Sequence, residues 1–439
     1  MMTALRSLTL SATLLLTASA WGQSAQIPAP PQSQPIVIHN ATVHTVANGV
    51  IEGDGYVVFE NGVITAVGRG APPEITNARA FDAAGLHVYP GLFASETTLG
   101  LVETRSVAVT IDTSELGTFN PEVRAAVAVN PDTDLIPVTR ANGILFGMTF
   151  PQGGVISGRA SLLRFDGWTW EDMAIDAEAG LAVNWPRTDI IPWISTSEAE
   201  QRRRVRESIS AITDMFEDAR RYYAAREADP TTQTDLRFEA MRAAIDREKP
   251  IFINASSASQ IESAVSWANE QNVRIIIVGA TSAERAIPVL QRHDIPVIVR
   301  GTHRLPGRRH DAYDTPFTLP AKLHEAGITF AIASGAEPGH ERNLNHIAAT
   351  AAAYGLPKEE ALRAVTLSPA RIFGVDDTYG SIEIGKSASL IITTGDPLEI
   401  TTDTLLAFID GRQIDLGNRH KRLYRKYLEK FRQLGLING

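Results

Sequence analysis

The sequence contains no cysteine among its 439 residues. Thiolate metal ligands, cysteine nucleophiles and disulfide bonds are therefore excluded, and the stability of the fold must come from its core. Basic residues are fewer than acidic ones, 41 against 50, which gives a formal net charge of -9. This balance argues against nucleic acid and against anionic membrane surfaces as partners.

Long hydrophobic runs are absent after the N-terminus, where one arginine precedes a short apolar run, SLTLSATLLL, and a small-residue ASA pattern. About 12 apolar residues are too few for a membrane anchor, which needs about 20. We therefore expect residues 1–25 to be a signal peptide, cleaved after Ala20 or Ala25, and the mature protein to be periplasmic. Residues 26–35, rich in Pro and Gln, are expected to be a disordered linker.

Short strand-like segments occur near both ends of the chain. IVIHNATVHTV, YVVFENG and ITAVG lie within residues 36–85, are rich in Val, Ile and Thr, and are separated by Asn-Gly and Gly turns. SIEIGKSASLIITTGDP and LAFIDGRQID, within residues 376–416, have the same character. We expect the two segments to form one small β-sandwich domain.

Residues 86–375 alternate between helical patterns and eight short apolar runs, which are LHVYPGLF, ILFGMTFP, SLLRFDG, LAVNW, IFINA, RIIIVGA, PVIVRG and TFAIAS. Continuous apolar runs of this length are typical of parallel strands buried on both faces. Together they predict an α/β fold, a (β/α)8 TIM-like barrel. An open doubly wound sheet is the alternative. No Gly-rich phosphate loop follows any run, so a dinucleotide site has no support.

Two further helices are expected. Residues 196–229 form a long charged helix that starts at a capping box of Ser197 and Glu200. We interpret its RRRVR run as a solvated face, because acidic residues surround it. Residues 417–439 contain RHKRLYRKYLEKFRQL, whose apolar residues recur at helical spacing. We expect an amphipathic helix that packs back on the body of the protein, with membrane binding as the alternative.

Polar and small residues stand where several of the expected barrel strands end. The first strand ends at Glu96 and Thr98, the fifth at Asn254 and Ser256, and the eighth at Gly335. Reacting and binding groups of a parallel barrel lie at the carboxyl ends of its strands. These five residues are therefore the expected ligand-binding residues of a polar barrel mouth.

Three stretches of the chain resemble the amidohydrolase superfamily, close to its imidazolonepropionase-like and prolidase-like members. They are PGLFASETTLG, IFINASSASQI, and the block from AYGLPKEEALRAVTLSPARIFGV to GSIEIGKSASLIITTGDPLE. The resemblance covers nearly everything after residue 35. It implies a metal-bearing barrel with a small β-sandwich, and attack on an amide carbon by a metal-activated water.

The metal ligands that the resemblance implies do not match this chain. Two histidines after the first strand would fall on Glu96 and Thr98, and a histidine after the fifth strand on Asn254 or Ser256. The aspartate that acts as the base for the water would fall on Gly335. The chain has no histidine between positions 87 and 293, and no lysine before position 249 that could be carboxylated. We therefore expect no metal cofactor of the usual kind.

Two classes of function stay open. The first is a non-catalytic barrel, a pseudoenzyme that binds a small amide- or peptide-like molecule and forms homo-oligomers or pairs with an active relative. The second is a hydrolase of carbon-nitrogen bonds, in non-peptide or dipeptide substrates, with a rebuilt site. Its candidate catalytic residues are Glu96, His303, Glu337 and His340, which would hold one divalent metal such as zinc. The simpler interpretation is that the last three pair with nearby arginines.

Overall fold

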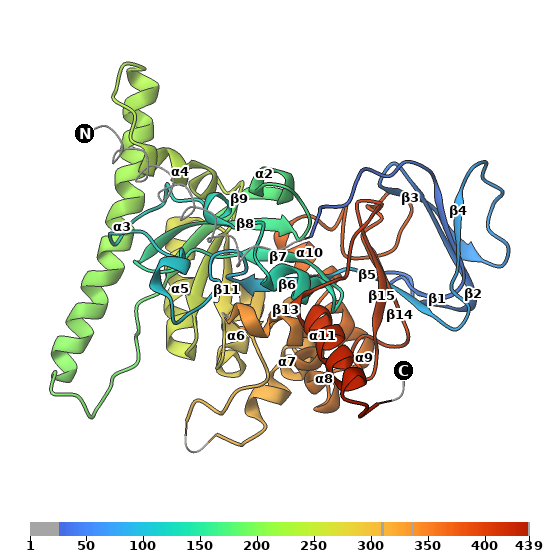
Figure 1. The fold of residues 1–439 in the computed structure, drawn as a ribbon. Coiled ribbons are helices and arrows are strands. Elements are labelled where there is room, and N and C mark those ends of the chain that lie inside the picture. Colours follow the sequence, from blue (N-terminus) through green and yellow to red (C-terminus); the bar gives the residue numbers. More distant parts are fainter. Residues whose placement is uncertain (1–25, 309–310, 336, 438–439) are drawn as a thin grey trace, which may run out of the picture.

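The computed structural model describes residues 26–308, 311–335 and 337–437. The expected signal peptide, residues 1–25, lies outside the described residues. None of the helices in the described ranges has the length and apolar content needed to cross a membrane. Two sheets organise the fold, and they lie at opposite sides of the molecule (Figure 1).

The first sheet is built from both ends of the chain, as the sequence predicts. Its strands follow the order β16-β15-β14-β5-β1-β2-β3, and β4 pairs with β1. Phe59, Val88 and Phe408 belong to its core, which joins the early and late segments. The strands are β1 Ile36–His44, β2 Val50–Glu60, β3 Val63–Arg69, β4 Arg79–Asp82, β5 His87–Pro90, β14 Leu390–Thr393, β15 Thr404–Ile409 and β16 Arg412–Gln413.

The second sheet is a nearly closed barrel with the strand order β13-β12-β11-β10-β9-β8-β7-β6. Each of the eight predicted apolar runs overlaps one of these strands, so the predicted barrel is confirmed. The strands are β6 Leu92–Thr97, β7 Ile144–Thr149, β8 Ile156–Arg164, β9 Ala174–Asn184, β10 Ile251–Ala255, β11 Ile275–Gly279, β12 Val297–Arg300 and β13 Phe330–Ala333.

Strand β8 departs from the regular (β/α)8 pattern, because it runs antiparallel to both β7 and β9. The connection from β7 to β8 consists only of residues 150–155. A parallel connection needs about a dozen residues or more, so a link this short returns the chain in the opposite direction. The remaining neighbours along the barrel, β6 with β7 and β9 through β13, pair in parallel.

Helices pack around the barrel, with α4, α5, α7 and α8 against its strands. The α-helices are α1 Leu135–Arg140, α2 Trp170–Met173, α3 Glu198–Ala228, α4 Leu236–Ile245, α5 Ala258–Gln271, α6 Ile287–Arg292, α7 Thr315–Glu325, α8 Leu344–Ala353, α9 Lys358–Arg363, α10 Leu367–Phe373 and α11 Arg419–Gln433. Short 3-10 helices are η1 Ala108–Thr110, η2 Ala125–Ala128, η3 Ala283–Arg285 and η4 Pro338–Asn343.

Helix α3 is the long charged helix that the sequence predicts, and it extends along one side of the molecule (Figure 1). Ser197 caps its N-terminus by accepting a hydrogen bond from the backbone N–H of Glu200. The first three arginines of its RRRVR run pair with glutamates of the same helix, for example Arg202 with Glu198 at 2.7 Å. The run is therefore a solvated, charge-balanced face rather than a basic patch.

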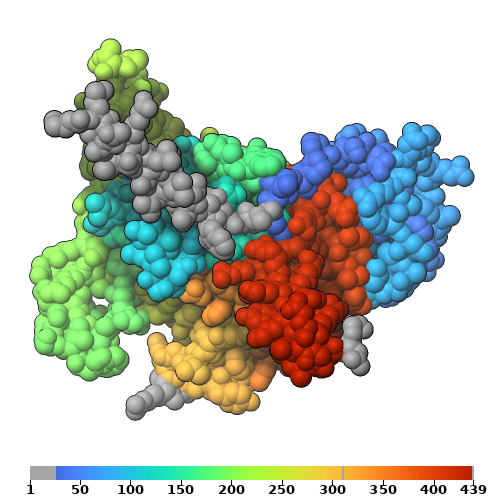
Figure 2. All heavy atoms as spheres, in the orientation of Figure 1, coloured from blue at the N-terminus to red at the C-terminus, as the bar shows by residue number. Residues whose placement is uncertain are grey.

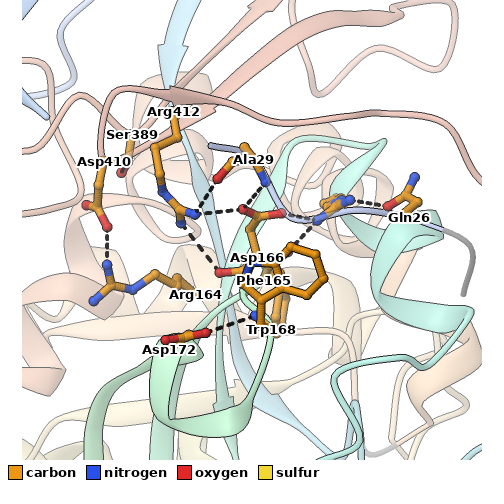
Figure 3. Close-up of polar contacts among 11 residues, drawn as sticks. Gln26, Ala29, Arg164, Phe165, Asp166, Trp168, Asp172, Ser389, Asp410 and Arg412 are labelled. Carbon is orange, nitrogen blue, oxygen red and sulfur yellow. Dashed lines mark hydrogen bonds and ion pairs between the residues drawn. The ribbon is translucent and has the colours of Figure 1, made fainter. Parts of the chain in front are cut away.

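A buried carboxylate holds the N-terminal segment against both sheets. Asp166 accepts hydrogen bonds from Arg140 at 2.8 Å, from Arg412 at 3.0 Å and from the backbone N–H of Ala29 at 3.1 Å (Figure 3). Arg140 belongs to α1 and Arg412 to β16. Residues 26–35 are fixed by such contacts, so the expectation that they form a disordered linker is wrong.

The C-terminal helix forms at the predicted place, but it does not bury its apolar residues. No residue of α11 is buried, and the helix meets the body through Arg422, which donates a hydrogen bond to Asp134 at 3.2 Å. The expectation that the apolar face packs back on the body is therefore wrong. Amphipathic spacing fixes which residues share a face, but it does not fix what that face contacts.

Candidate binding site at the barrel mouth

Polar side chains follow the apolar ones inside the barrel. Successive residues of a strand face opposite ways, so every second side chain points inward. Phe252 and Ile298 belong to the inner cluster, and Asn254 and Arg300 stand two residues further along their strands. Asn184 ends β9 in the same position, and its backbone is paired with Asn254. The carboxyl ends of β9, β10 and β12 therefore bring two amides and a guanidinium to the mouth.

An ion pair between Glu96 and Arg300 lies at this mouth. The Nε of Arg300 donates to Oε2 of Glu96 at 3.0 Å, and an Nη group donates to Oε1, so the contact is bidentate. The side chain of Glu96 is 8% exposed and that of Arg300 is 30% exposed. The charge of Glu96 raises the pKa of Arg300 above its already high ordinary value. Arg300 is therefore a permanent cation beside the first barrel strand.

An irregularity in β6 turns Glu96 toward the mouth. Leu92 and Ala94 belong to the cluster between the barrel and its helices, so strict alternation would place Glu96 on that outer side. The pairing of β6 with β7 shifts register between Ala94 and Thr97. Such bulges re-aim a side chain near a strand end, and this one places the Glu96 carboxylate against Arg300.

A second carboxyl, that of Glu341 from η4, is fully buried beside this ion pair. Ser334 donates a hydrogen bond to its Oε1 at 2.6 Å, whereas its Oε2 has no hydrogen-bond partner. Burial, with a smaller contribution from the charge of Glu96, raises the pKa of Glu341 to about 8. Glu341 therefore keeps its proton at neutral pH, and the local charge comes from Glu96 and Arg300.

A cavity of about 220 Å³ opens beside the Glu96–Arg300 pair. Its polar lining includes the side chains of Gln152, Ser157, Asn184 and Asn254, and its apolar lining includes Phe150, Phe252 and Val278. The amide of Asn254 donates to Asn184 at 3.1 Å, and Asn184 donates to Ser157 at 3.0 Å. The cavity thus combines aromatic walls, linked amide groups and one accessible guanidinium, which is the composition of a small-molecule site.

The structure brings two of the five predicted ligand-binding residues, Glu96 and Asn254, to the cavity. Gly335 lies next to it, because a Cβ added there would stand 3.6 Å from Cγ of Arg300. Ser256 lies at the start of α5, where its backbone N–H donates to Gln260 at 3.2 Å. Thr98 is buried behind the mouth and is absent from the cavity lining.

The other candidate catalytic residues lie outside the cavity lining. His303 is hydrogen-bonded to Thr350 at 2.7 Å, and burial together with His346 lowers its pKa. Glu337 forms an ion pair with Arg105, and His340 is exposed on η4. None of these three side chains lines the cavity that Glu96 lines.

The donor set at the mouth does not fit the metal that the resemblance implies. Within residues 26–308, 311–335 and 337–437, no group of three or more His, Asp or Glu side chains could hold a metal ion. Both oxygens of Glu96 accept hydrogen bonds from Arg300 instead. A guanidinium in this position repels a divalent cation and neutralises the carboxylate that would bind it.

Sequence reasoning missed Arg300 and Glu341, the two residues that define the electrostatics of the mouth. Arg300 is the last residue of the apolar strand in PVIVRG. A charged residue at the carboxyl end of an apolar strand could have indicated a residue of the barrel mouth. Glu341 gave no such signal, because its burial depends on how η4 packs against α1, α8 and β6.

Comparisons with known proteins agree with this architecture. Residues 317–415 match the amidohydrolase family. Amidohydrolase tasK of Hapsidospora irregularis is 25% identical over 402 residues, which cover 81% of this chain and 39% of that protein. The imidazolonepropionase of Flavobacterium psychrophilum is 40% identical over 81 residues, 18% of this chain and 20% of that protein. The chain thus spans well under half the length of these curated relatives.

Solved structures extend the match to most of the chain. An amidohydrolase from Thermotoga maritima has a TM-score of 0.76 and 25% identity, covering 87% of this chain and 99% of that one. A prolidase complexed with N-methylphosphonate-L-proline has a TM-score of 0.52 and 16% identity, covering 87% and 100%, and shows the fold alone. Residues 317–415 therefore match an amidohydrolase family domain, and most of the chain shares the fold of solved amidohydrolases.

Proposed function

We propose that this protein is an exported member of the amidohydrolase superfamily that binds a small amide- or peptide-like molecule at the barrel mouth without metal-dependent hydrolysis. The observation that carries the proposal is the bidentate Arg300–Glu96 pair beside the 220 Å³ cavity. The pair engages Glu96, the one carboxylate among the residues that stand at the expected ligand positions. A metal-activated water therefore has no support there.

The lining of the cavity supports an amide-containing ligand. Asn184, Asn254 and Gln152 each carry one hydrogen-bond acceptor and an N–H donor group, the complement of a peptide or amide unit. Phe150 and Phe252 pack edge to face, with ring centroids 5.1 Å apart, and offer an apolar wall to the rest of the ligand. The accessible part of Arg300 suits a ligand carboxylate, because a guanidinium binds carboxylates in a fork geometry.

Thermal unfolding in the presence of small ligands tests this proposal. The panel contains N-acetylated amino acids, their amides, and dipeptides. We expect at least one member to raise the unfolding temperature of the wild type and to lose this effect in Asn254→Leu. The matched control is Asn269→Leu, an exposed position outside the cavity lining, which should keep the effect.

An assay for hydrolysis of the same panel can contradict the binding proposal. Products are measured by mass spectrometry with and without added zinc or manganese. Metal-dependent hydrolysis at about 1 per second or faster, an ordinary enzyme rate, would contradict the binding proposal. Light scattering on the same samples tests whether the chain forms homo-oligomers or needs an active relative as partner.

A second candidate function is hydrolysis of a carbon-nitrogen bond by a rebuilt site, and Glu341 is the observation that favours it. A buried carboxyl with a pKa of about 8 can hold and release a proton near neutral pH, as a general acid requires. Any hydrolytic activity should then fall at least about a hundredfold in Glu341→Gln. Activity that instead depends on His303 or His340, tested by alanine substitution, would point to a differently built centre.

A further inference from the structure

The C-terminal helix α11 presents an apolar face to solvent. Leu423, Tyr424, Tyr427, Phe431 and Leu434 are each between 40% and 67% exposed. Residues three, four, seven or eight apart lie on one side of a helix, so these side chains form a single apolar face. Helix α11 lies on the outside of the molecule, and its red atoms form part of a raised surface (Figures 1 and 2).

The contacts of α11 with the body explain why this face stays exposed. Arg422 and Arg419 both approach Asp134, at 3.2 Å and 4.0 Å. Lys421, Arg422 and Arg425 line the hollow between the helix and residues 413–418. The helix is therefore held by its basic side, and the apolar side faces away from the protein.

Charge is concentrated on the same helix. Residues 419–433 contain seven Lys and Arg and a single acidic residue, Glu429, whereas the whole chain has a net charge of -9. Interactions between exposed charges are screened beyond roughly 8–10 Å at physiological salt. A surface in contact with α11 therefore experiences a local positive charge rather than the negative charge of the whole molecule.

We propose that α11 docks the protein onto an anionic lipid surface. The apolar face would lie at the boundary between headgroups and acyl chains, and the lysines and arginines along its edges would contact lipid phosphates. An anionic lipid surface is favoured because its negative charge is complementary to the positive charge of α11. Two copies of α11 packed face to face would bring Lys426 and Lys430 of one copy close to those of the other, so like charges oppose a symmetric contact.

Vesicle sedimentation tests the proposal with the full chain. The probes are vesicles of phosphatidylcholine alone and vesicles with about a third phosphatidylglycerol. We expect at least about tenfold stronger binding to the anionic vesicles, and loss of most of this preference at about 0.5 M salt. Because residues 1–25 are common to all variants, a difference between variants reports on α11.

Two double variants separate the contribution of the apolar side chains of α11 from that of its charge. Tyr427→Gln with Phe431→Gln removes apolar contacts, and Lys426→Gln with Lys430→Gln removes charge; each should weaken anionic binding about tenfold. The matched control is Leu305→Gln with Ile400→Gln, two side chains that are 87% and 81% exposed elsewhere. It should bind like the wild type. Since all these positions are solvent-exposed, the unfolding temperature should not change.

Two results would overturn the proposal. One is equal binding of the wild type to neutral and anionic vesicles. The other is an unchanged anionic preference in the Tyr427→Gln, Phe431→Gln variant. If vesicle preference is absent and light scattering shows a dimer that this variant dissociates, the apolar face is a self-association surface instead.

Discussion

Two buried carboxylate–arginine sites of the molecule differ in the size of the cavity beside them. Asp166 receives hydrogen bonds from two guanidinium groups and one backbone N–H, and it ties three segments of the chain together (Figure 3). Glu96 receives one guanidinium, that of Arg300, beside an open cavity. Each site also has a buried polar atom without a hydrogen-bond partner, Nε of Arg140 in the first and Oε2 of the neighbouring Glu341 in the second.

The difference separates a structural site from a functional one. At Asp166 every hydrogen bond links segments that are distant in the sequence. The site therefore holds the N-terminal segment and the first sheet in place. At the barrel mouth, amides and a cation line a cavity at the carboxyl ends of strands, where barrel proteins bind ligands. A buried ion pair alone does not mark a site; what distinguishes the mouth is its cavity of about 220 Å³, against about 50 Å³ beside Asp166.

The largest expected effect is a pH dependence caused by Glu341. Its pKa is raised from 4.5 to about 8 in the folded chain, so the folded state binds this proton more tightly than the unfolded state. The stabilisation is complete below about pH 4.5 and is lost as the pH rises through 8, by at most about 5 kcal/mol. Urea unfolding across this range should show a steeper decline for the wild type than for Glu341→Gln. Equal slopes would contradict the assignment.

Removing the carboxylate of the structural site should have the next largest effect. Asp166→Ala leaves Arg140 buried without its partner, and we expect the free energy of unfolding to fall by about 3–5 kcal/mol. The control is Asp54→Ala, which breaks a surface pair with Arg69 and should cost less than about 1 kcal/mol. Similar losses for both variants would remove the distinction between these ion pairs.

A double-mutant cycle at the mouth should give a coupling energy that is smaller than the two effects above. Glu96→Gln, Arg300→Met and their combination are compared by urea unfolding. Because the contact is bidentate and mostly buried, we expect a coupling energy of about 1–3 kcal/mol. Effects that add within about 0.3 kcal/mol would mean that the two groups do not interact in solution.

The smallest effect is expected at Gly335, the position beside Arg300. Its φ of +109° is a conformation that other residues rarely adopt, while an added Cβ would meet only Cγ of Arg300 at 3.6 Å. Gly335→Ala should therefore cost about 1–2 kcal/mol through backbone strain. Gly307→Ala, where a Cβ meets nothing and φ is not positive, should be close to neutral. A larger loss at Gly335 would show that the mouth is sterically closed there.

The sequence predicted the barrel well, because its apolar runs are local signals and each overlaps a strand. It also placed Glu96 and Asn254 at the mouth, because strand ends can be read from the same pattern. Arg300 was not predicted because its role rests on its contact with Glu96, which lies 204 residues away in the sequence, and a local pattern does not show such a contact. The burial of Glu341 and the exposure of α11 depend on tertiary packing, for which local periodicity carries no information.

Metal content of the purified chain tests the central claim most directly. The protein is prepared without chelators or affinity histidines, incubated with zinc or manganese, desalted, and measured by plasma mass spectrometry. If Arg300 takes the place of a metal beside Glu96, the bound ion should stay below about a tenth of an equivalent, since Arg300 engages both oxygens of Glu96. A stoichiometric ion that is lost in Glu96→Ala would contradict the account.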